Sequence, residues 1–547
     1  MKAIIILFFI LIYDSAVSQL NEEWVRSFNG PVNGNDEALT HVTDNSGNVY
    51  SSGKILGSGS GFDIYTVKYN PSGNILWERI YNGPGNGNDI AYSIELDNTG
   101  NVFVAGESMG SGTDKDFLLI KYNDLGAEQW NRRYNGNSSS AETPEKAVTD
   151  EAGNVIITGT SHEPGVLFDV VTIKYNSDGD QLWKKHFNGA SSGNDFADDM
   201  AVDKSGNIFV CGSTFEAATI NDYLIIKYSA AGDELWHKTY NGTANGNDNM
   251  TSITADVSGN AVITGTSVGA GTGLDIATIK YSPAGDVIWE RRFTTSTVNI
   301  EEGKAITSDN LGNIFVTGTS TGFSTSYDYM TIMYSPGGDL IWSKNYNGPG
   351  SNNFDEPRSI AADNNGNVYV AGLSQGTGTM DDMVIINYNY SGNEVWVNRF
   401  NSAADRNDVA NNISLDNSGN IIVSGFISGV TSGMDFSVVK FSVITNVLSV
   451  SNETPSAYSL SQNYPNPFNP STKIRFDIMN DDKTGAHDVR LSVYDILGKQ
   501  AAVLVNKKLS AGSYEAEFDA SDLSGGIYFY RLETAGFTET KSMLLLK

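Results

Sequence analysis

The chain has 547 residues, of which 39% are hydrophobic and 57 are glycine, whereas only 13 are proline. This length predicts more than one domain, and the composition favours short strands joined by tight turns over helices or collagen. The net charge of −29 lies almost entirely on residues 1–459, so we expect a surface that repels nucleic acid and anionic lipid.

The first 18 residues have the pattern of a removable export signal. Lys2 is followed by eleven apolar residues and then by the small-residue site Ala16-Val17-Ser18. Eleven apolar residues are too few to span a bilayer. We therefore expect a signal peptide over residues 1–18, cleaved after Ser18, and no transmembrane segment in the rest of the chain.

Tryptophan marks a repeat that fills residues 19–443. Consecutive tryptophans lie 53 residues apart, except for one interval of 54. Two aspartate series, beginning at Asp44 and Asp63, follow the same period. Because three independent series agree, the sequence indicates eight internal repeats. The tryptophans are Trp24, Trp77, Trp130, Trp183, Trp236, Trp289, Trp342 and Trp396.

Each unit contains four strand-like segments and no helical period. Phe103 and Val104 are adjacent and both apolar, so their strand must be covered on both faces. Neighbouring blades of a β-propeller provide such cover. The sequence therefore predicts an all-β protein, with a propeller of eight four-stranded repeats; seven blades are the alternative, if one unit folds outside the ring. In the unit that begins at Trp77 the segments are 77–81, 91–96, 102–105 and 117–122.

The two ends of the repeat region complement each other. The last unit begins at Trp396 and has no tryptophan strand after it, whereas residues 22–28 supply such a strand with no unit before it. We expect the N-terminal strand to pair into the last blade and close the ring. We also expect each tryptophan to pack between adjacent blades.

These units resemble the SBBP-type β-propeller repeats of bacterial secreted proteins. The similarity rests on the turn and strand from Asp363 to Gly372, and on Ile226-Lys227-Tyr228 leading to Trp236. It covers about residues 20–443. The resemblance implies the propeller fold and an extracellular setting, and it carries no common catalytic activity.

After the repeats, residues 444–459 are polar and irregular, and we expect a linker there. Residues 460–547 alternate as short strands and predict a small antiparallel β-sandwich. This segment resembles the type A C-terminal sorting domain of type IX secretion cargo. That resemblance implies contact with the type IX machinery, export across the outer membrane of a Bacteroidetes-like bacterium, and release or attachment to the cell surface. Its motif residues are Tyr464, Pro465, Asn466, Pro467, Phe468, Asn469, Pro470, Gly498, Lys499, Lys541 and Lys547.

The strongest candidate for a binding site is a set of acids in the loops between units. Each follows an asparagine in a loop rich in glycine and asparagine, and the propeller geometry would gather these loops at one end of the ring. Carboxylate and amide oxygens suit Ca²⁺ or sugar hydroxyls. The structural alternative is that each acid caps its own turn. The acids are Asp36, Asp89, Asp195, Asp248 and Asp408.

Catalytic patterns are weak in this sequence. Gly-x-Ser-x-Gly recurs, for example from Gly106 to Gly110, at the same place in several units, so we interpret it as a turn and not as a catalytic serine. The five histidines lack metal-ligand spacing, and we expect Cys211 to be a buried small residue. The pair Asp198-Asp199 should face opposite sides of a strand.

These observations predict a non-enzymatic binding or structural module, secreted or held at the cell surface, whose ligand is a glycan or a protein. The alternative is a propeller-fold hydrolase or lyase that acts on extracellular polysaccharide. We predict no cofactor, with Ca²⁺ at the loop acids as the alternative.

Overall fold

The computed structural model describes residues 19–136, 141–162, 167–191, 193–296, 300–321, 326–350, 354–444, 447–451, 455–479, 487–509, 511–520, 523–534 and 536–547. The predicted signal peptide lies outside the described residues. The described chain contains β-strands and no α-helix, and it forms two compact units. One unit is Glu22–Ser442, and the other contains Val443–Lys547.

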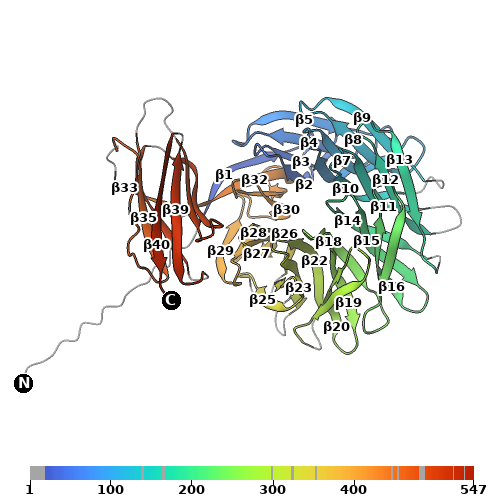
Figure 1. Ribbon diagram of the computed structural model, residues 1–547. Coiled ribbons are helices and arrows are strands. Elements are labelled where there is room, and N and C mark those ends of the chain that lie inside the picture. The colour runs from blue at the N-terminus through green and yellow to red at the C-terminus, as the bar shows by residue number, and fades with distance from the viewer. Residues whose placement is uncertain are drawn as a thin grey trace, which may run out of the picture. The chain divides into compact units, whose positions relative to one another are not determined.

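The first unit consists of eight four-stranded antiparallel sheets arranged as the blades of a propeller (Figure 1). This arrangement confirms eight blades and not seven. The first strand of each blade lies innermost, and the second strand pairs with it. The innermost strands are β2 (Glu37–Thr43), β6 (Asp89–Leu96), β10 (Thr143–Thr149), β14 (Asp195–Val202), β18 (Asn249–Ala255), β22 (Glu301–Ser308), β26 (Asp355–Ala362) and β30 (Val409–Leu415). The second strands are β3 (Val49–Leu56), β7 (Val102–Met109), β11 (Val155–His162), β15 (Ile208–Glu216), β19 (Ala261–Gly269), β23 (Ile314–Thr321), β27 (Val368–Gln375) and β31 (Ile421–Ser428).

The third strand of each blade continues the sheet outward, and the tryptophan strand forms the outer edge. The third strands are β4 (Phe62–Tyr69), β8 (Lys115–Tyr122), β12 (Phe168–Tyr175), β16 (Ile220–Tyr228), β20 (Gly273–Tyr281), β24 (Tyr327–Tyr334), β28 (Asp381–Tyr388) and β32 (Met434–Ile444). The outer strands are β5 (Ile75–Tyr81), β9 (Glu128–Tyr134), β13 (Gln181–Phe187), β17 (Glu234–Tyr240), β21 (Val287–Phe293), β25 (Leu340–Tyr346), β29 (Glu394–Phe400) and β1 (Gln19–Phe28).

The second and third strands are buried on both faces, as their continuous apolar runs predict. Phe103 and Val104 are both fully buried, although their side chains leave opposite faces of β7. Phe103 packs with the core of the third blade, whereas Val104 packs with residues of the first. Each blade is therefore held by burial of apolar surface against both of its neighbours.

The ring is closed by the N-terminal strand. The last sheet has the order β1-β32-β31-β30, so β1 takes the outer position that a tryptophan strand occupies in every other blade. Trp24 donates from Nε1 to the carbonyl oxygen of Pro71 in the first blade at 3.0 Å and packs on Tyr69. Trp77 makes the equivalent contacts with Asp124 and Tyr122 of the second blade. These contacts confirm that the tryptophans pack between blades.

The hairpin between the first two strands of each blade is capped by its aspartate. In the second blade, Oδ1 of Asp97 accepts hydrogen bonds from the backbone N–H groups of Thr99 and Asn101, both at 2.9 Å. Gly100 adopts φ +84°, a conformation that glycine alone takes without strain. The aspartates of the Asp44 series therefore stabilise the hairpin turns of the blades.

The second unit consists of two four-stranded antiparallel sheets that share one hydrophobic core, which includes Phe476, Leu491 and Tyr530. We expected a linker over residues 444–459, but residues 447–451 form a strand that pairs with β38. Residues 448–451 alternate between apolar and polar, which suits an edge strand, and the polar composition of the surrounding residues did not reveal it. The strands are β33 (Val447–Ser451), β34 (Ser459–Leu460), β35 (Ser471–Ile478), β36 (His487–Tyr494), β37 (Gln500–Leu509), β38 (Gly512–Asp519), β39 (Gly526–Thr534) and β40 (Phe537–Leu545).

Candidate functional site

The predicted loop acids Asp36, Asp89, Asp195, Asp248 and Asp408 are all fully buried. Each lies where an interblade loop enters an innermost strand, and its carboxylate accepts backbone hydrogen bonds. Asp89 accepts from Gly83 N at 2.6 Å and from Met109 N at 3.2 Å. Asp248 accepts from Gly242 N at 2.7 Å and from Val268 N at 2.8 Å. These bonds are the ones that the structural alternative requires, whereas ligand or Ca²⁺ binding by these acids stays a prediction.

The Gly-x-Ser-x-Gly segments lie in strands and are not turns, which corrects our interpretation. Gly106 and Ser108 belong to β7, and Ser108 is buried between Asp89 on β6 and Asp116 on β8. A Cβ on Gly106 would overlap the backbone carbonyl oxygen of Ile90, because a bulge in β6 brings the two backbones close together. The glycine therefore allows the two backbones to approach closely at the bulge, and the buried serine packs inside the blade.

Every innermost strand carries this β-bulge at the same place, three residues after a buried acid. In the three blades outside the predicted set, which the sequence reasoning missed, that acid is Glu142, Glu301 or Asp355. The extra residue of the bulge is different in each blade, so eight different side chains occupy eight equivalent positions. All eight keep part of their surface open to solvent, whereas the residue directly before each of them is buried. We call these residues the bulge ring. They are Leu39, Tyr92, Glu145, Asp198, Thr251, Lys304, Arg358 and Asn411.

The bulge ring lies at the inner edges of the blades, around the axis of the propeller, where β2, β14, β18 and β26 converge (Figure 1). Neighbouring members contact one another or the adjacent blade. Arg358 donates from Nη1 to Oδ1 of Asn411 at 2.6 Å, and Asn411 donates to the carbonyl oxygen of Ala38 at 3.1 Å. Thr251 donates to the carbonyl oxygen of Gly303 at 3.0 Å. Arg358 and Asn411 are therefore joined directly, and Asn411 and Thr251 each bond to the backbone of the next blade.

Charge is divided across the bulge ring. Glu145 and Asp198 come from the third and fourth blades, whereas Lys304 and Arg358 come from the sixth and seventh. Lys304 lies 3.0 Å from Glu302, and Arg358 lies 3.7 Å from Glu356. The charges on the basic side are therefore partly neutralised by neighbouring glutamates, whereas the acidic side gathers several carboxyl groups.

The acidic side contains two carboxyl groups with raised pKa values. Desolvation and then the charge of Asp199 raise the pKa of Asp198 to about 7. Desolvation, followed by the charges of Asp198, Glu107 and Asp199, raises the pKa of Glu145 to about 8. We expected Asp198 and Asp199 to face opposite ways, but the bulge at Asp198 breaks the alternation of the strand and brings their charges together.

The stability of the propeller should therefore fall as the pH rises from about 5 to 8. Folded Asp198 and Glu145 hold protons that the unfolded chain has already released, so the unfolded state is favoured increasingly across this range. Asp198→Asn with Glu145→Gln should flatten the dependence of Tm on pH between 6 and 8, measured by circular dichroism. Asn411→Ala, a bulge variant that removes no titrating group, should leave the slope unchanged. An unaltered slope in the double variant would show that other groups cause it.

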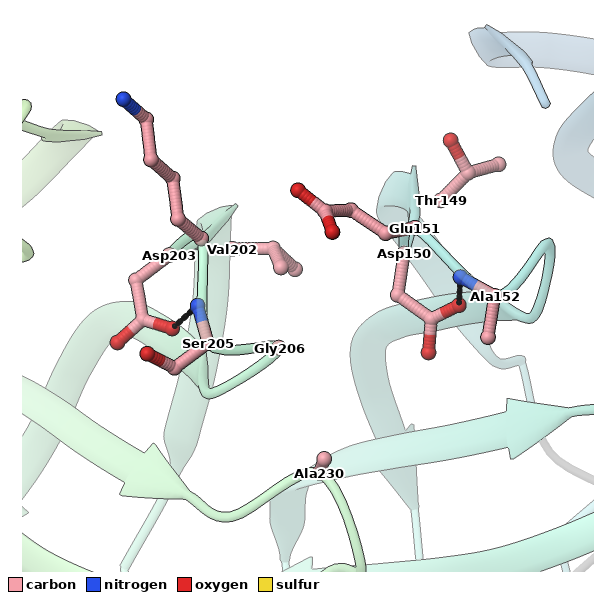
Figure 2. Close-up of a pocket in the computed structure, with 10 residues that line it drawn as sticks. Thr149, Asp150, Glu151, Ala152, Val202, Asp203, Ser205, Gly206 and Ala230 are labelled. Atoms are coloured by element: carbon pink, nitrogen blue, oxygen red, sulfur yellow. Dashed lines mark hydrogen bonds between the residues drawn. The ribbon is translucent and has the colours of Figure 1, made fainter. Parts of the chain in front are cut away.

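A cavity of about 410 Å³ lies between the turns of the third and fourth blades, and Asp150 and Asp203 line it (Figure 2). Each of these carboxylates bonds to its own turn, Asp150 to Ala152 N at 3.0 Å and Asp203 to Ser205 N at 2.9 Å. Asp150 also pairs with Lys174 at 2.8 Å. These carboxylates already bond to their own turns, and Asp150 also pairs with Lys174. They are therefore less available to a ligand than the side chains of the bulge ring. Within the described residues, no three His, Cys, Asp or Glu side chains gather as a metal centre.

Most of the predicted sorting residues lie on one side of the second unit, at its N-terminal entry and its last strand. Phe468 is buried, its N–H donates to Leu544 O at 3.0 Å, and its carbonyl accepts from Leu546 N at 2.9 Å. Tyr464 is 80% exposed, and its backbone pairs with Lys473. Gly498 takes φ +81° in the turn that precedes Lys499. The Pro-rich entry thus anchors the C-terminal strand through Phe468, while the side chain of Tyr464 stays exposed.

Two family models match this chain. The Secretion system C-terminal sorting domain matches residues 462–545, and the Beta-propeller repeat called SBBP matches residues 189–214, 288–323 and 341–378. A curated relative, the uncharacterized WD repeat-containing protein L264 of Acanthamoeba polyphaga mimivirus, is 26% identical over 413 residues. That alignment covers 67% of this chain and 26% of the relative, so the chain spans about a quarter of the relative's length.

Solved structures align with this chain only at low identity and low TM-score. A protein of unknown function from Dyadobacter fermentans aligns with 64% of this chain and 94% of its own at 7% identity and a TM-score of 0.36. An α-L-arabinofuranosidase from Clostridium thermocellum aligns with 48% and 94% at 13% identity and a TM-score of 0.26. The apocarotenoid oxygenase of Synechocystis aligns with 90% and 97% at 9% identity and a TM-score of 0.32.

The two matched families agree with the two units of the structure. The repeat matches fall in the propeller, and the sorting-domain match falls in the second unit. Over the residues that the structure describes, no helix is long and apolar enough to cross a membrane. The chain carries SBBP β-propeller repeats and a type IX C-terminal sorting domain, which marks proteins exported to the cell surface or the extracellular space.

Proposed function

We propose that the propeller is a non-enzymatic binding module that takes an extracellular glycan or protein at the bulge ring. The observation that carries this proposal is the contrast between two kinds of position. The loop acids and hairpin aspartates repeat from blade to blade and are committed to backbone hydrogen bonds. The bulge residues differ in every blade and keep solvent-accessible surface.

The chemistry of the bulge ring suits a polar ligand. Tyr92 offers an aromatic face for a sugar ring, whereas Asp198, Arg358 and Asn411 offer acceptors and donors for hydroxyl, carboxylate or amide groups. A few converging polar groups around a partly apolar surface are typical of a ligand site. Because Leu39 and Tyr92 lie next to each other in blade order, an apolar segment adjoins the charged ones.

The experiment is a glycan and surface-polymer array, probed with the chain from residue 19 onward, in Ca²⁺ and again in chelator. We expect Asp198→Asn with Arg358→Gln to reduce binding at least tenfold without lowering Tm by more than a few degrees. Asp89→Asn with Asp248→Asn serves as the comparison at the loop acids. Binding that depends on Ca²⁺ and disappears only in the loop-acid variant would place the ligand at the loops instead. Binding to nothing on the array would leave a protein ligand.

A hydrolase or lyase that acts on polysaccharide is the second candidate. It is favoured by the neighbouring carboxyl groups of Glu145 and Asp198, whose raised pKa values suit a general acid near neutral pH. Incubation with a panel of polysaccharides, followed by assays for reducing ends and for unsaturated uronate, tests this reading. Product that disappears in Glu145→Gln would establish the enzyme, whereas absence of product with retained binding would support the binding module.

A further inference from the structure

A buried histidine lies at the interface between the first and last blades, which we call the closing interface. There β2 of the first blade packs against β30 and β31 of the last (Figure 1). His41 lies on β2 and is 6% exposed. Its Nδ1 lies 2.8 Å from Oγ of Ser424 on β31, and its Nε2 lies 2.7 Å from Oγ of Ser414 on β30. Both ring nitrogens therefore bond to hydroxyl groups of the last blade.

This histidine is an exception among eight equivalent positions. The position lies five residues after the buried acid at the start of each innermost strand, and the other seven blades have a buried apolar side chain there. The propeller contains four histidines, and His41 alone is buried. The closing interface is thus the one interface that has an ionisable group at this core position. The seven apolar equivalents are Ile94, Ala147, Met200, Ile253, Ile306, Ile360 and Ile413.

Protonation of His41 would place a positive charge where no counter-charge meets it. A neutral imidazole has one N–H group and one bare nitrogen, so one serine accepts from the ring and the other donates to it. The strands β30 and β31 carry no ionisable residue. The ionisable groups on β2 itself and on β3 and β6, which also pack against it, do not bond to His41; they are Glu37, Tyr50, Lys54, Asp89, Tyr92 and Glu95.

Burial therefore lowers the pKa of His41 from 6.5 to about 3. Between these two values the separated strands bind a proton that the closed interface excludes. Closure is consequently favoured fully above pH 6.5 and less and less as the pH falls toward 3. At pH 4.5, two pH units below the pKa of an exposed histidine, this effect favours opening about 100-fold.

We propose that His41 makes the closing interface sensitive to acid, so that the first and last blades separate on acidification before any other two neighbouring blades do. Separation would also break two hydrogen bonds that cross this interface, from Nδ2 of Asn411 to Glu37 Oε1 at 2.9 Å and to the carbonyl oxygen of Ala38 at 3.1 Å. Because Asn411 and Leu39 lie on opposite sides, the bulge ring would be interrupted between them. The inference does not depend on ligand binding, since its readouts are stability and hydrogen exchange.

Two substitutions in the chain from residue 19 onward remove the titrating group. In His41→Ile the position gains the residue that five other blades have there. In His41→Gln it gains a side chain that stays neutral and can still donate and accept hydrogen bonds. For both variants, the ratio of the unfolding equilibrium constant of the parent to that of the variant should rise about 100-fold from pH 7.5 to 4.5 in urea unfolding.

The matched control is His237→Gln, which removes an exposed histidine from β17 and should leave this ratio constant. The carboxyl groups of Asp198 and Glu145 act in the opposite direction between pH 5 and 8. They are present in the parent and in every variant, so their contribution cancels in the ratio.

Hydrogen exchange in the unaltered chain locates the opening and needs no variant that might lose its fold. Between pH 7.0 and 5.0, after correction for intrinsic exchange rates, amides of β1, β2 and β30–β32 should lose about tenfold or more protection relative to those of β18–β23. His41→Gln should remove this difference between the two regions.

Three results would overturn the proposal. A ratio that stays constant with pH in both variants would show that the closed interface accepts a proton at His41 without cost. Equal loss of protection in all blades would show that acid does not open the closing interface first. A loss confined to β1, β2 and β30–β32 that persists in His41→Gln would assign the sensitivity to another group.

Discussion

Replacing Trp24 with alanine is expected to destabilise the propeller by about 3–5 kcal/mol, the range for removal of a buried large aromatic side chain. Trp24 is 6% exposed, packs on Tyr69 at 5.6 Å and donates to Pro71 O. It is the tryptophan of β1, the strand that closes the ring from the far end of the chain. Urea unfolding followed by far-UV circular dichroism measures the loss.

The matched control is Trp130→Ala. Trp130 makes the equivalent hydrogen bond, to Ser177 O, but it is more exposed and its strand follows directly from its own blade. Its loss should cost less. Hydrogen exchange adds a test specific to closure, because amides of β31 and β32 should exchange faster in Trp24→Ala and not in Trp130→Ala. Equal costs and unchanged exchange at β32 would show that closure does not depend on Trp24.

Gly106→Ala should cost about 3 kcal/mol or more, although it adds only one methyl group. That methyl would overlap the carbonyl oxygen of Ile90, and the obstacle is backbone, which cannot rotate away. The bulge in β6, which presents Tyr92, would have to shift. We expect a lower urea midpoint together with altered environment of Tyr92 in nuclear magnetic resonance spectra.

Gly112→Ala is the control for this variant. Gly112 has φ +89°, and no atom lies within 4 Å of its would-be Cβ, so alanine there carries only the conformational cost of about 1–2 kcal/mol. A cost for Gly106→Ala no greater than for Gly112→Ala would mean that the bulge adapts freely. In that case the bulge ring would not be held rigidly by its glycines.

Repetition made the fold predictable from the sequence. The period of Trp77 and its equivalents, the apolar pairs such as Phe103-Val104 and the unpaired strand at residues 22–28 each specify a feature that the structure contains. The strand at residues 447–451 was missed because it is short and lies in an otherwise polar stretch, and its partner strand lies far along the chain.

The bulge ring could not be predicted by the same reasoning. The sequence reasoning assumed strict alternation and placed Asp198 and Asp199 on opposite faces of the strand, because no local sequence feature of β14 indicates a bulge. A signal was nevertheless present: the position three residues after each loop acid changes in every repeat, while Gly106 and its equivalents on the next strand stay constant. Positions conserved among the repeats led our interpretation toward the loop acids, which the structure buries.

The most direct measurement is an alanine scan of the bulge ring in the full chain from residue 19, read for both stability and binding to a panel of soluble extracellular polysaccharides and surface proteins. The account predicts that most of these variants unfold within about 0.5 kcal/mol of the parent, while at least Tyr92→Ala, Asp198→Ala and Arg358→Ala lose tenfold or more in affinity. Binding that survives all eight substitutions would contradict the account and move the site away from the axis of the propeller.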